Sequence, residues 1–360
     1  MIKSAYVHVP FCRQKCGYCS FTSFCDTGSK NEYVKVLCDE IGSRYHGEPL
    51  QTLYFGGGTP SLLGVEDFQK IISIFDFEPG AEITSEANPE KLTTEYLSGL
   101  KEVGVNRLSL GAQSFDDKML EKIGRKHSAK DVFDAVNAAR DAGFKNISVD
   151  LMYGLPGQSA ADFEKSLKTA ISLDVEHISS YGLKIEEGCR FFQNPPHESL
   201  PDDEVCAEMF FLMVKTLENA GFRHYEISNF AKPGFESRHN LAYWNCSEYY
   251  GFGCSASGYE EGIRYTNTRN LKEYLSDFGK KSETVVLSEK DRFEEEIFLG
   301  LRKADGICVK ALNERFDTDF DRQFGSVLKK YDEFFERKDG RLRLNDRGIV
   351  VCNYILSEFI

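Results

Sequence analysis

A chain of 360 residues, of which 41% are hydrophobic, is long enough for about two domains with a substantial buried core. Its 57 acidic residues outnumber its 44 basic ones and give a net charge of −13, which argues against general binding to nucleic acids. The 11 cysteines, without a signal peptide or an apolar run of membrane-spanning length, predict a reducing, cytoplasmic location.

The first feature along the chain is a loop with three closely spaced cysteines. Cys12, Cys16 and Cys19 have C-x3-C-x2-C spacing and follow an apolar, β-branched run that is predicted to be a strand. Three thiolates on one loop can bind three irons of a cubane cluster and leave the fourth iron without a protein ligand. Zinc is the alternative, because Cys25 is close enough in sequence to act as a fourth ligand. A disulfide is disfavoured by the compartment and by the tight loop. The spacing favours an iron–sulfur cluster.

Strands and helices alternate along the following part of the chain. Buried strands are predicted at residues 52–55, 81–86, 105–110, 146–151 and 176–181, and helices at residues 31–46, 64–75, 93–103, 129–142 and 161–173. With the strand before the cysteines, this gives six strands that alternate with helices. Such a pattern indicates a parallel α/β fold.

Polar or glycine-rich residues stand at the C-terminal ends of five of these strands. They are the cysteine loop, the GGGT run at residues 56–59, residues 86–88, Gln113 and Asp150. In a β/α barrel these strand ends share one face, so the five groups are expected to converge on a single site. Each alone has a structural explanation, such as a turn, a helix N-cap or a satisfied core amide. Together they indicate a ligand site.

The residue types at this site suit a cationic nucleoside that carries an amino acid. A glycine-rich strand end lets backbone amides approach an amino or carboxylate group, while Glu86, Gln113 and Asp150 supply acceptors for an ammonium group or ribose hydroxyls. S-adenosylmethionine fits this set of groups. Its amino and carboxylate groups could occupy the open iron, and one electron from the cluster would cleave its sulfonium to give a carbon radical.

Several stretches resemble the radical SAM proteins of the oxygen-independent coproporphyrinogen III oxidase group. They are YVHVPFCRQKCGYC, YFGGGTPSLL, EANPE, VNRLSLGAQSFDDKMLEKIGRKHS and VDLMYGLPGQ. The resemblance runs through nearly the whole chain and implies a partial (β/α)6 radical SAM barrel. It also implies that Cys12, Cys16 and Cys19 bind a [4Fe–4S] cluster. The residues that it places around S-adenosylmethionine are Tyr6, Tyr18, Gly57, Gly58, Thr59, Glu86, Gln113, Arg125 and Asp150.

Two departures distinguish the chain from the oxidase itself. In the oxidase a C-x-C ending includes the third cysteine and a long segment precedes the motif, whereas here Ser20 and Phe21 follow Cys19 and eleven residues precede Cys12. Both departures resemble the heme chaperones of the group and argue against coproporphyrinogen decarboxylation, although the oxidase remains the alternative. The resemblance implies heme as cargo and apo-hemoproteins as partners. Peripheral membrane association and a cluster-dependent homodimer are further expectations.

A second chaperone-like motif lies downstream. His239, Asn240, Tyr243 and Trp244 form the sequence HNxxYW, which the resemblance links to heme binding. His239 offers an imidazole ligand, and Tyr243 together with Trp244, the only tryptophan, could provide a flat aromatic wall. The structural alternative is a hydrogen-bonded histidine beside core aromatics.

We expect three units along the chain. Residues 1–190 form the barrel with the cluster and S-adenosylmethionine, and residues 191–285 form an extension that completes the barrel edge and carries HNxxYW. Residues 286–360 form a C-terminal mixed, largely helical, winged-helix-like domain. We also predict helices at residues 203–220 and 321–337, the latter before a short β-wing and a closing helix. Since the overall charge is acidic, packing or docking is a better expectation for the last domain than DNA binding.

Overall fold

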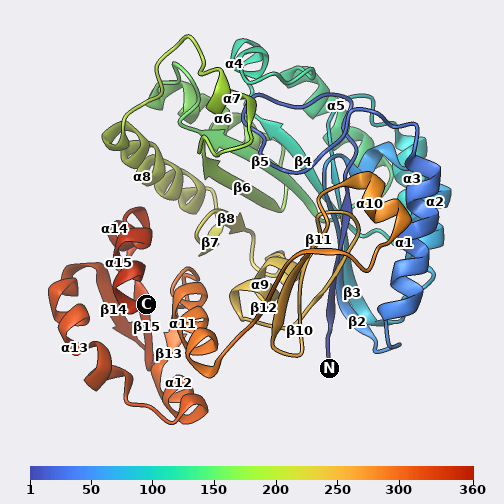
Figure 1. Cartoon of the computed structure of the whole chain (residues 1–360). Helices are drawn as coiled ribbons and strands as arrows, with labels where there is room; N and C mark the ends of the chain where they lie inside the picture. The colour runs from blue at the N-terminus through green and yellow to red at the C-terminus, as the bar shows by residue number, and fades with distance from the viewer.

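A nine-stranded sheet forms the main body of the protein. The computed structural model describes residues 1–360 and orders the strands β7-β8-β6-β5-β4-β3-β2-β1-β9. Strands β1 to β6 and β9 are parallel, whereas β8 and β7 extend the β6 edge in antiparallel fashion. The strands are β1 (Ser4–Val9), β2 (Leu50–Gly57), β3 (Phe77–Ala87), β4 (Arg107–Gln113), β5 (Ile147–Tyr153), β6 (His177–Gly182), β7 (Arg223–Glu226), β8 (Asn229–Ala231) and β9 (Tyr250–Phe252). The predicted α/β core of six parallel strands is confirmed, and the sheet is an open arc rather than a closed barrel (Figure 1).

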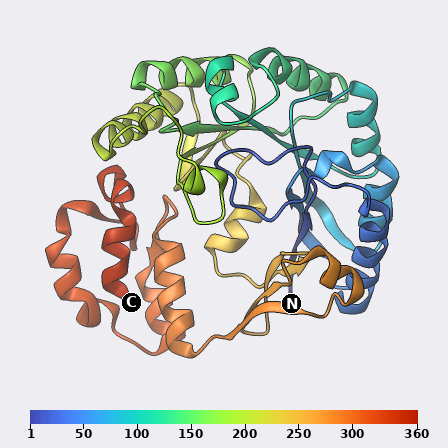
Figure 2. The same ribbon diagram turned by 45° about the horizontal axis from the view of Figure 1, so that its top comes forward.

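Helices connect the parallel strands and cover the outer side of the arc (Figure 2). They are α1 (Lys30–Arg44), α2 (Val65–Ile72), α3 (Thr94–Glu102), α4 (Asp117–Lys122), α5 (Ala129–Asp141), α6 (Ala160–Ser172), α7 (Arg190–Gln193) and α8 (Asp203–Asn219), with a short 3-10 turn η1 (Pro60–Leu62). Helices α5 and α6 each begin with a capping box, in which Ser128 pairs with Asp131 and Ser159 pairs with Asp162. These caps satisfy the first free N–H groups and fix where each helix leaves the strand end before it.

The main core lies between this sheet and its helices. The strands bury an apolar face in this core, as in β1, where the alternating residues Ala5, Val7 and Val9 are fully covered. Their partners include Leu53 and Phe55 of β2. The other residues of β1, Ser4, Tyr6 and His8, lie on the opposite face of the strand, so polar side chains occur along the strands as well as at their ends.

A smaller antiparallel sheet follows β9. It has the order β10-β11-β12 and consists of β10 (Ser257–Glu260), β11 (Ile263–Asn267) and β12 (Lys281–Val286). Helix α9 (Arg238–Trp244) precedes it and α10 (Leu271–Ser276) lies between β11 and β12. Helix α9 carries the HNxxYW motif against strands β2 and β3, since His239 Nδ1 lies 2.8 Å from Thr52 Oγ1 of β2 and Arg238 Nη2 donates to the carbonyl of Gly80 of β3 at 2.6 Å.

The last part of the chain has the element order of a winged helix. The elements are α11 (Glu289–Gly300), β13 (Ile307–Cys308), α12 (Val309–Phe316), α13 (Phe320–Lys330), η2 (Asp332–Phe334), β14 (Phe335–Lys338), β15 (Arg341–Leu344), α14 (Asp346–Val350), α15 (Cys352–Leu356) and η3 (Ser357–Phe359). The three strands form an antiparallel sheet of order β13-β15-β14. No helix in the protein is both long and apolar enough to cross a membrane.

The predicted helix at residues 321–337 is wrong in its C-terminal half. Helix α13 ends at Lys330, and Phe335 to Lys338 form β14, which pairs with β15. The pairing places Phe335 opposite Leu344 and Arg337 opposite Leu342. A tertiary contact therefore overrides the local helical preference of this segment.

Candidate functional site

The cysteine loop crosses the concave side of the sheet, where the parallel strands end (Figure 2). Its base is closed by two backbone hydrogen bonds, from the Cys12 N–H to the carbonyl of Phe24 at 3.0 Å and from the Phe24 N–H to the carbonyl of Pro10 at 2.7 Å. In the middle of the loop, the Gly17 N–H donates to the carbonyl of Ile123 at 2.9 Å. The loop is thus held in place over the strand ends.

A cleft of about 150 Å³ lies beneath this loop, and we call it the cysteine cleft. The structure brings together all three predicted cluster cysteines and every predicted S-adenosylmethionine residue except Tyr6. The predicted residues that line the cleft are Cys12, Cys16, Cys19, Tyr18, Gly57, Gly58, Thr59, Glu86, Gln113, Arg125 and Asp150. Strand ends that are far apart in sequence therefore do converge on one site.

The thiols of the loop have polar neighbours, but they do not converge on one point that could hold a single metal ion. Thr59 Oγ1 lies 3.5 Å from Cys12 Sγ, and Arg125 Nη1 lies 3.9 Å from Cys16 Sγ. Burial raises the pKa of Cys12 and raises that of Cys19 to about 11, so their thiolates need a strong positive partner.

This arrangement fits a multi-iron cluster better than a single metal ion. No three His, Cys, Asp or Glu side chains converge closely enough to hold one ion. In a cubane cluster each cysteine binds a different iron, so the sulfurs need not meet at one point. Cys25, the fourth ligand that a zinc site would need, is exposed and does not line the cleft.

Two positions of the glycine-rich strand end require glycine. Gly57 has φ +103°, and a Cβ there would lie 2.4 Å from the ring of His8. A Cβ on Gly58 would lie 2.6 Å from the carbonyl oxygen of Phe11 and 2.7 Å from that of Val9. The glycines therefore let the end of β2 pass directly against the end of β1, which keeps backbone rather than side chains at the cleft wall.

Two carboxylates line the cysteine cleft from neighbouring strands. Glu86 on β3 accepts from the Tyr54 hydroxyl at 2.8 Å and from the Gly57 N–H at 3.2 Å, and burial raises its pKa to about 7. Asp150 on β5 accepts from the Ser109 hydroxyl at 3.0 Å, and burial raises its pKa as well. Hydroxyl groups therefore orient both carboxylates, but no neighbouring cation fully neutralises their negative charge.

Gln113, at the end of β4, and Arg125, after α4, also line the cysteine cleft. Gln113 has φ +66°, a backbone conformation that is unfavourable for a side chain of this kind, and its Oε1 accepts from the Tyr181 hydroxyl at 2.9 Å. Arg125 donates to Asn88 Oδ1 at 2.9 Å and to the carbonyl of Gly111. Backbone strain at a cleft wall is typical of functional sites.

A larger cleft of about 620 Å³, which we call the wide cleft, adjoins the cysteine cleft. The two share Phe21, Gly57 and Glu86 as lining residues. Three of the four HNxxYW residues line the wide cleft, and so does Tyr6. Its lining is Tyr6, His8, Ser20, Phe21, Thr22, Tyr54, Gly57, Glu86, Glu186, Glu187, His239, Asn240, Tyr243, Tyr249, Ser255, Ser257, Thr266 and Arg269.

His239 is buried, with both ring nitrogens engaged. Its Nδ1 lies 2.8 Å from Thr52 Oγ1 and its Nε2 lies 2.7 Å from the Tyr243 hydroxyl, while its ring stacks on Tyr54 at 5.0 Å between centroids. Because Thr52 donates its own proton to Ser4 at 2.9 Å, we assign the imidazole proton to Nδ1. The lone pair is then on Nε2, and burial lowers the pKa of His239 to about 3.

Trp244 does not share the wide cleft with Tyr243. It lines two smaller cavities, one with Tyr243 and with Phe298 of α11, and one with residues of α11 and of the segment that follows it. It also lies close to the buried carboxyl of Glu226, whose charged form it favours. Tyr243 and Trp244 therefore meet at one small cavity, but only Tyr243 also lines the wide cleft.

Some site residues carried a signal in the sequence that the strand-end argument did not use. Tyr54 and Tyr181 lie near the ends of predicted buried strands, and each orients a carboxylate or amide of the cleft. Ser109, on another such strand, orients Asp150. A hydroxyl inside an otherwise apolar strand is the signal that would have found all three.

Two family profiles match the chain. The Radical SAM superfamily matches residues 6–170, and the HemN C-terminal domain matches residues 287–351. Among curated proteins, the heme chaperone HemW of Bacillus subtilis (strain 168) is 40% identical over 376 residues, which cover 100% of this chain and 99% of that protein. The heme chaperone HemW of Lactococcus lactis is 37% identical, with 99% and 97% coverage.

One solved structure is similar over nearly the whole chain. It is described as "Coproporphyrinogen III oxidase (HemN) from Escherichia coli is a Radical SAM enzyme". It matches with a TM-score of 0.87 and 22% identity, over 99% of this chain and 90% of that one. This likeness shows the fold, whereas the curated relatives are similar in sequence as well.

Proposed function

Because the chain belongs to the heme chaperone HemW family, we propose that it binds heme and passes it to apo-hemoproteins. The observation that carries this proposal is 40% identity to a curated heme chaperone over the full length of both chains. The wide cleft supports it, because a volume of about 620 Å³ lies in the range of pockets that bind small molecules and cofactors.

We further propose that the cysteine cleft holds a [4Fe–4S] cluster through Cys12, Cys16 and Cys19 and S-adenosylmethionine beside it. When bound, the cluster supplies an open iron for the amino and carboxylate groups of S-adenosylmethionine and one electron for its cleavage. The chain's own contribution is positional. Its glycine-rich strand end lets the ligand approach the backbone closely, and Glu86 and Asp150 accept hydrogen bonds from ammonium or hydroxyl groups.

For heme, we propose His239 as an iron ligand through Nε2. The Nδ1–H is held by Thr52, as is common for metal-binding histidines whose second nitrogen is fixed by a hydrogen bond. The Tyr243 hydroxyl lies where the iron would have to approach. Since His239 is buried and Tyr243 is only partly buried, ligation requires Tyr243 to turn away from the imidazole.

We place the protein in the cytoplasm. All 11 cysteines are free, including the buried Cys189, Cys254 and Cys352, as expected in a reducing compartment. Peripheral membrane association and a cluster-dependent homodimer remain predictions.

A hemin titration tests the heme proposal. Anaerobically reconstituted protein is titrated with hemin, and binding is followed by the Soret band. The wild type should bind saturably, and His239→Ala should bind more weakly with an altered spectrum. His197→Ala, which changes a histidine on an exposed loop, is the matched control and should bind like the wild type. Non-saturable wild-type binding, or identical binding by His239→Ala, would contradict the proposal.

The same preparation distinguishes a chaperone from an oxidase. Reduced protein incubated with S-adenosylmethionine and coproporphyrinogen III should not accumulate protoporphyrinogen IX over multiple turnovers. Such turnover would replace the chaperone with a radical enzyme. The release of 5′-deoxyadenosine alone would not, since S-adenosylmethionine can be cleaved without coupling to a substrate.

A further inference from the structure

The wide cleft contains a single permanently cationic side chain. Three of its lining residues are glutamates, and Arg269 is its only lysine or arginine. The two histidines of the cleft have both ring nitrogens engaged by neutral groups, those of His8 by the Tyr6 hydroxyl and the Thr22 carbonyl and those of His239 by the Thr52 and Tyr243 hydroxyls. An anionic group bound in this cleft therefore has one cation with which to pair.

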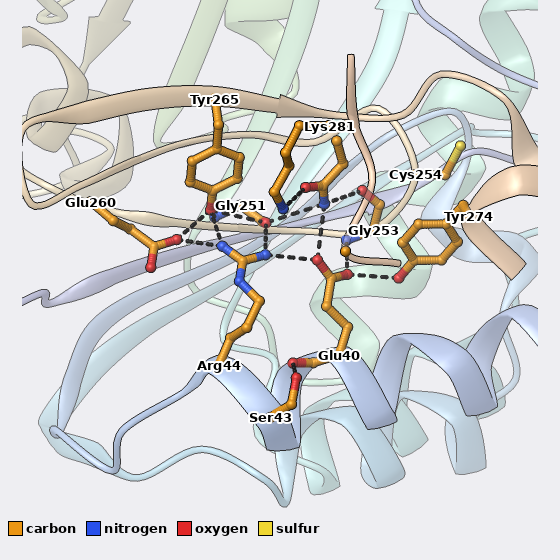
Figure 3. A network of polar contacts seen from close by, with 12 residues as sticks. Glu40, Ser43, Arg44, Gly251, Gly253, Cys254, Glu260, Tyr265, Tyr274 and Lys281 are labelled. Carbon is orange, nitrogen blue, oxygen red and sulfur yellow. Dashed lines mark hydrogen bonds and ion pairs between the residues drawn. The ribbon is translucent and has the colours of Figure 1, made fainter. Parts of the chain in front are cut away.

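The backbone that carries Arg269 is fixed by a buried polar network (Figure 3). Arg269 lies in the turn between β11 and α10, and two residues earlier Asn267 donates to Glu40 at 3.0 Å and to the carbonyl of Gly253 at 2.8 Å. Glu40 of α1 is fully buried and also accepts from the Tyr274 hydroxyl at 2.7 Å. Contacts to α1 on one side and to α10 on the other hold the turn in position.

The side chain of Arg269, in contrast, has no partner. It is exposed at the cleft and makes no hydrogen bond or ion pair within the protein. Arg44, an arginine of the polar network, instead pairs with Glu40 at 2.7 Å and also with Glu260. A free guanidinium on a fixed backbone is suited to ligand binding, because little conformational freedom of the chain is lost when the ligand arrives.

The two exposed glutamates of the cleft are on a different part of its rim. Glu186 and Glu187 lie in the segment after β6, which is well separated from α10 in both ribbon views (Figures 1 and 2). Glu186 accepts from the Ser20 hydroxyl at 3.0 Å and pairs with Lys184 at 3.4 Å. A carboxylate ligand would be repelled at that part of the rim and attracted toward Arg269.

Resting on the proposed heme function, we infer that Arg269 binds a propionate carboxylate of heme and so sets which edge of the macrocycle lies toward α10. The two propionates are the only anionic groups on the periphery of heme. A guanidinium matches a carboxylate with two parallel N–H donors, which a lysine cannot reproduce. With the propionate edge at Arg269, the macrocycle would occupy the cleft that Tyr243 and His239 also line.

Two ligands and four proteins test this inference. Hemin and its dimethyl ester, in which both propionates are masked, are titrated in the same detergent into the reconstituted full-length wild type, Arg269→Gln, Arg269→Lys and Arg292→Gln. Arg292 is the matched control, because it is also exposed but does not line the wide cleft.

We expect Arg269→Gln to weaken hemin binding by about three- to tenfold, as for a charged hydrogen bond at a partly exposed site. Its affinity for the dimethyl ester should equal that of the wild type, Arg269→Lys should be intermediate for hemin, and Arg292→Gln should be unchanged. High salt should reduce the difference between wild type and Arg269→Gln.

Two results would overturn the inference while leaving the heme function intact. One is an unchanged hemin affinity in Arg269→Gln. The other is an equal loss for hemin and for the dimethyl ester, which would mean that Arg269 shapes the cleft instead of binding a carboxylate. Failure of the wild type to bind hemin saturably would instead refute the proposed function and, with it, this inference.

Discussion

The hydroxyl of Tyr243 lies 2.7 Å from Nε2 of His239, the ring nitrogen that carries the imidazole lone pair. The tyrosine therefore occupies the position that an iron ligated by His239 would need. Helix α9 places the two residues four apart, so they share one face of the helix. The HNxxYW motif therefore contains both the proposed heme ligand and the group that competes with the iron for it.

Tyr243→Phe should consequently strengthen hemin binding. It removes one neutral hydrogen bond that ligation would otherwise have to break, which corresponds to a gain of roughly two- to tenfold in affinity. Tyr249→Phe is the control, since Tyr249 lines the same cleft but does not contact His239. The measurement is the hemin titration in the three proteins. Weaker binding by Tyr243→Phe would show that the tyrosine, not the histidine, contacts the heme.

Cys12→Ala should abolish the iron–sulfur cluster, whereas Cys25→Ala should retain it. Both cysteines lie on the same loop, but only Cys12 lines the cysteine cleft. After anaerobic reconstitution, the iron content is measured, together with the visible absorption of the cluster and its decrease on reduction. Equal loss in both variants, or a stoichiometric zinc content without iron, would contradict a three-cysteine cluster site.

Gly57→Ala should destabilise the protein more than Gly47→Ala. Both glycines have positive φ, +103° and +87°, but a Cβ at residue 47 meets nothing, whereas one at residue 57 meets the ring of His8. That ring cannot move freely, because it bonds the Tyr6 hydroxyl and the carbonyl of Thr22, both at 3.0 Å. We expect a loss of about 1–2 kcal/mol for Gly47→Ala from backbone strain and about 2–4 kcal/mol for Gly57→Ala.

Chemical denaturation of the two glycine variants, compared with the wild type, measures this difference. Equilibrium binding of S-adenosylmethionine gives a second readout, and it should be lost in Gly57→Ala and kept in Gly47→Ala. If the two variants were equally stable, the contact between Gly57 and His8 would not be the reason for glycine at this position.

Glu226 should make the fluorescence of Trp244 depend on pH. Burial raises the pKa of this carboxyl to about 7, and Trp244 lies beside it as the only tryptophan of the chain. Ionisation near pH 7 should therefore change the emission of the wild type. Glu226→Gln should lose this titration, whereas the exposed Glu102→Gln should keep it.

The same carboxyl affects stability with a defined sign. Its folded pKa is above the unfolded value of about 4.3, so the folded state binds the extra proton between these two values. Stability should fall as pH rises from about 4 to about 7, by up to roughly 3 kcal/mol. Denaturation midpoints should show this decline in the wild type and a flatter profile in Glu226→Gln. A decline of equal size in the variant would assign it to other groups.

Much of the fold could be predicted because local sequence signals suffice for parallel α/β units. The strand ends that carry Cys12, Gly57, Glu86 and Asp150 converge as expected, since strand order and polarity determine where those ends lie. The helix predicted to reach Arg337 is wrong at its C-terminal end for the opposite reason, because that end depends on a contact between distant segments. Strand β14 forms only because β15 pairs with it, and such pairing between segments has no local signature.

The wide cleft could not be derived from sequence for a related reason. Its lining comes from β1, β2, α9 and the turn that carries Arg269, which only tertiary packing brings together. Helical spacing likewise does not reveal that Tyr243 lines this cleft whereas Trp244 does not. The HNxxYW sequence was recognisable, but the absence of Trp244 from the lining of the wide cleft was not.

Transfer of heme to an acceptor tests the central claim most directly. Heme-loaded protein is mixed with the apo-form of a b-type hemoprotein in the presence of an excess of a free-heme scavenger, and the Soret band and activity of the acceptor are followed. The account predicts that the acceptor gains heme and activity from the wild type despite the scavenger, and less from His239→Ala. Heme that reaches only the scavenger, or an acceptor that gains no more than it does from free hemin, would contradict it.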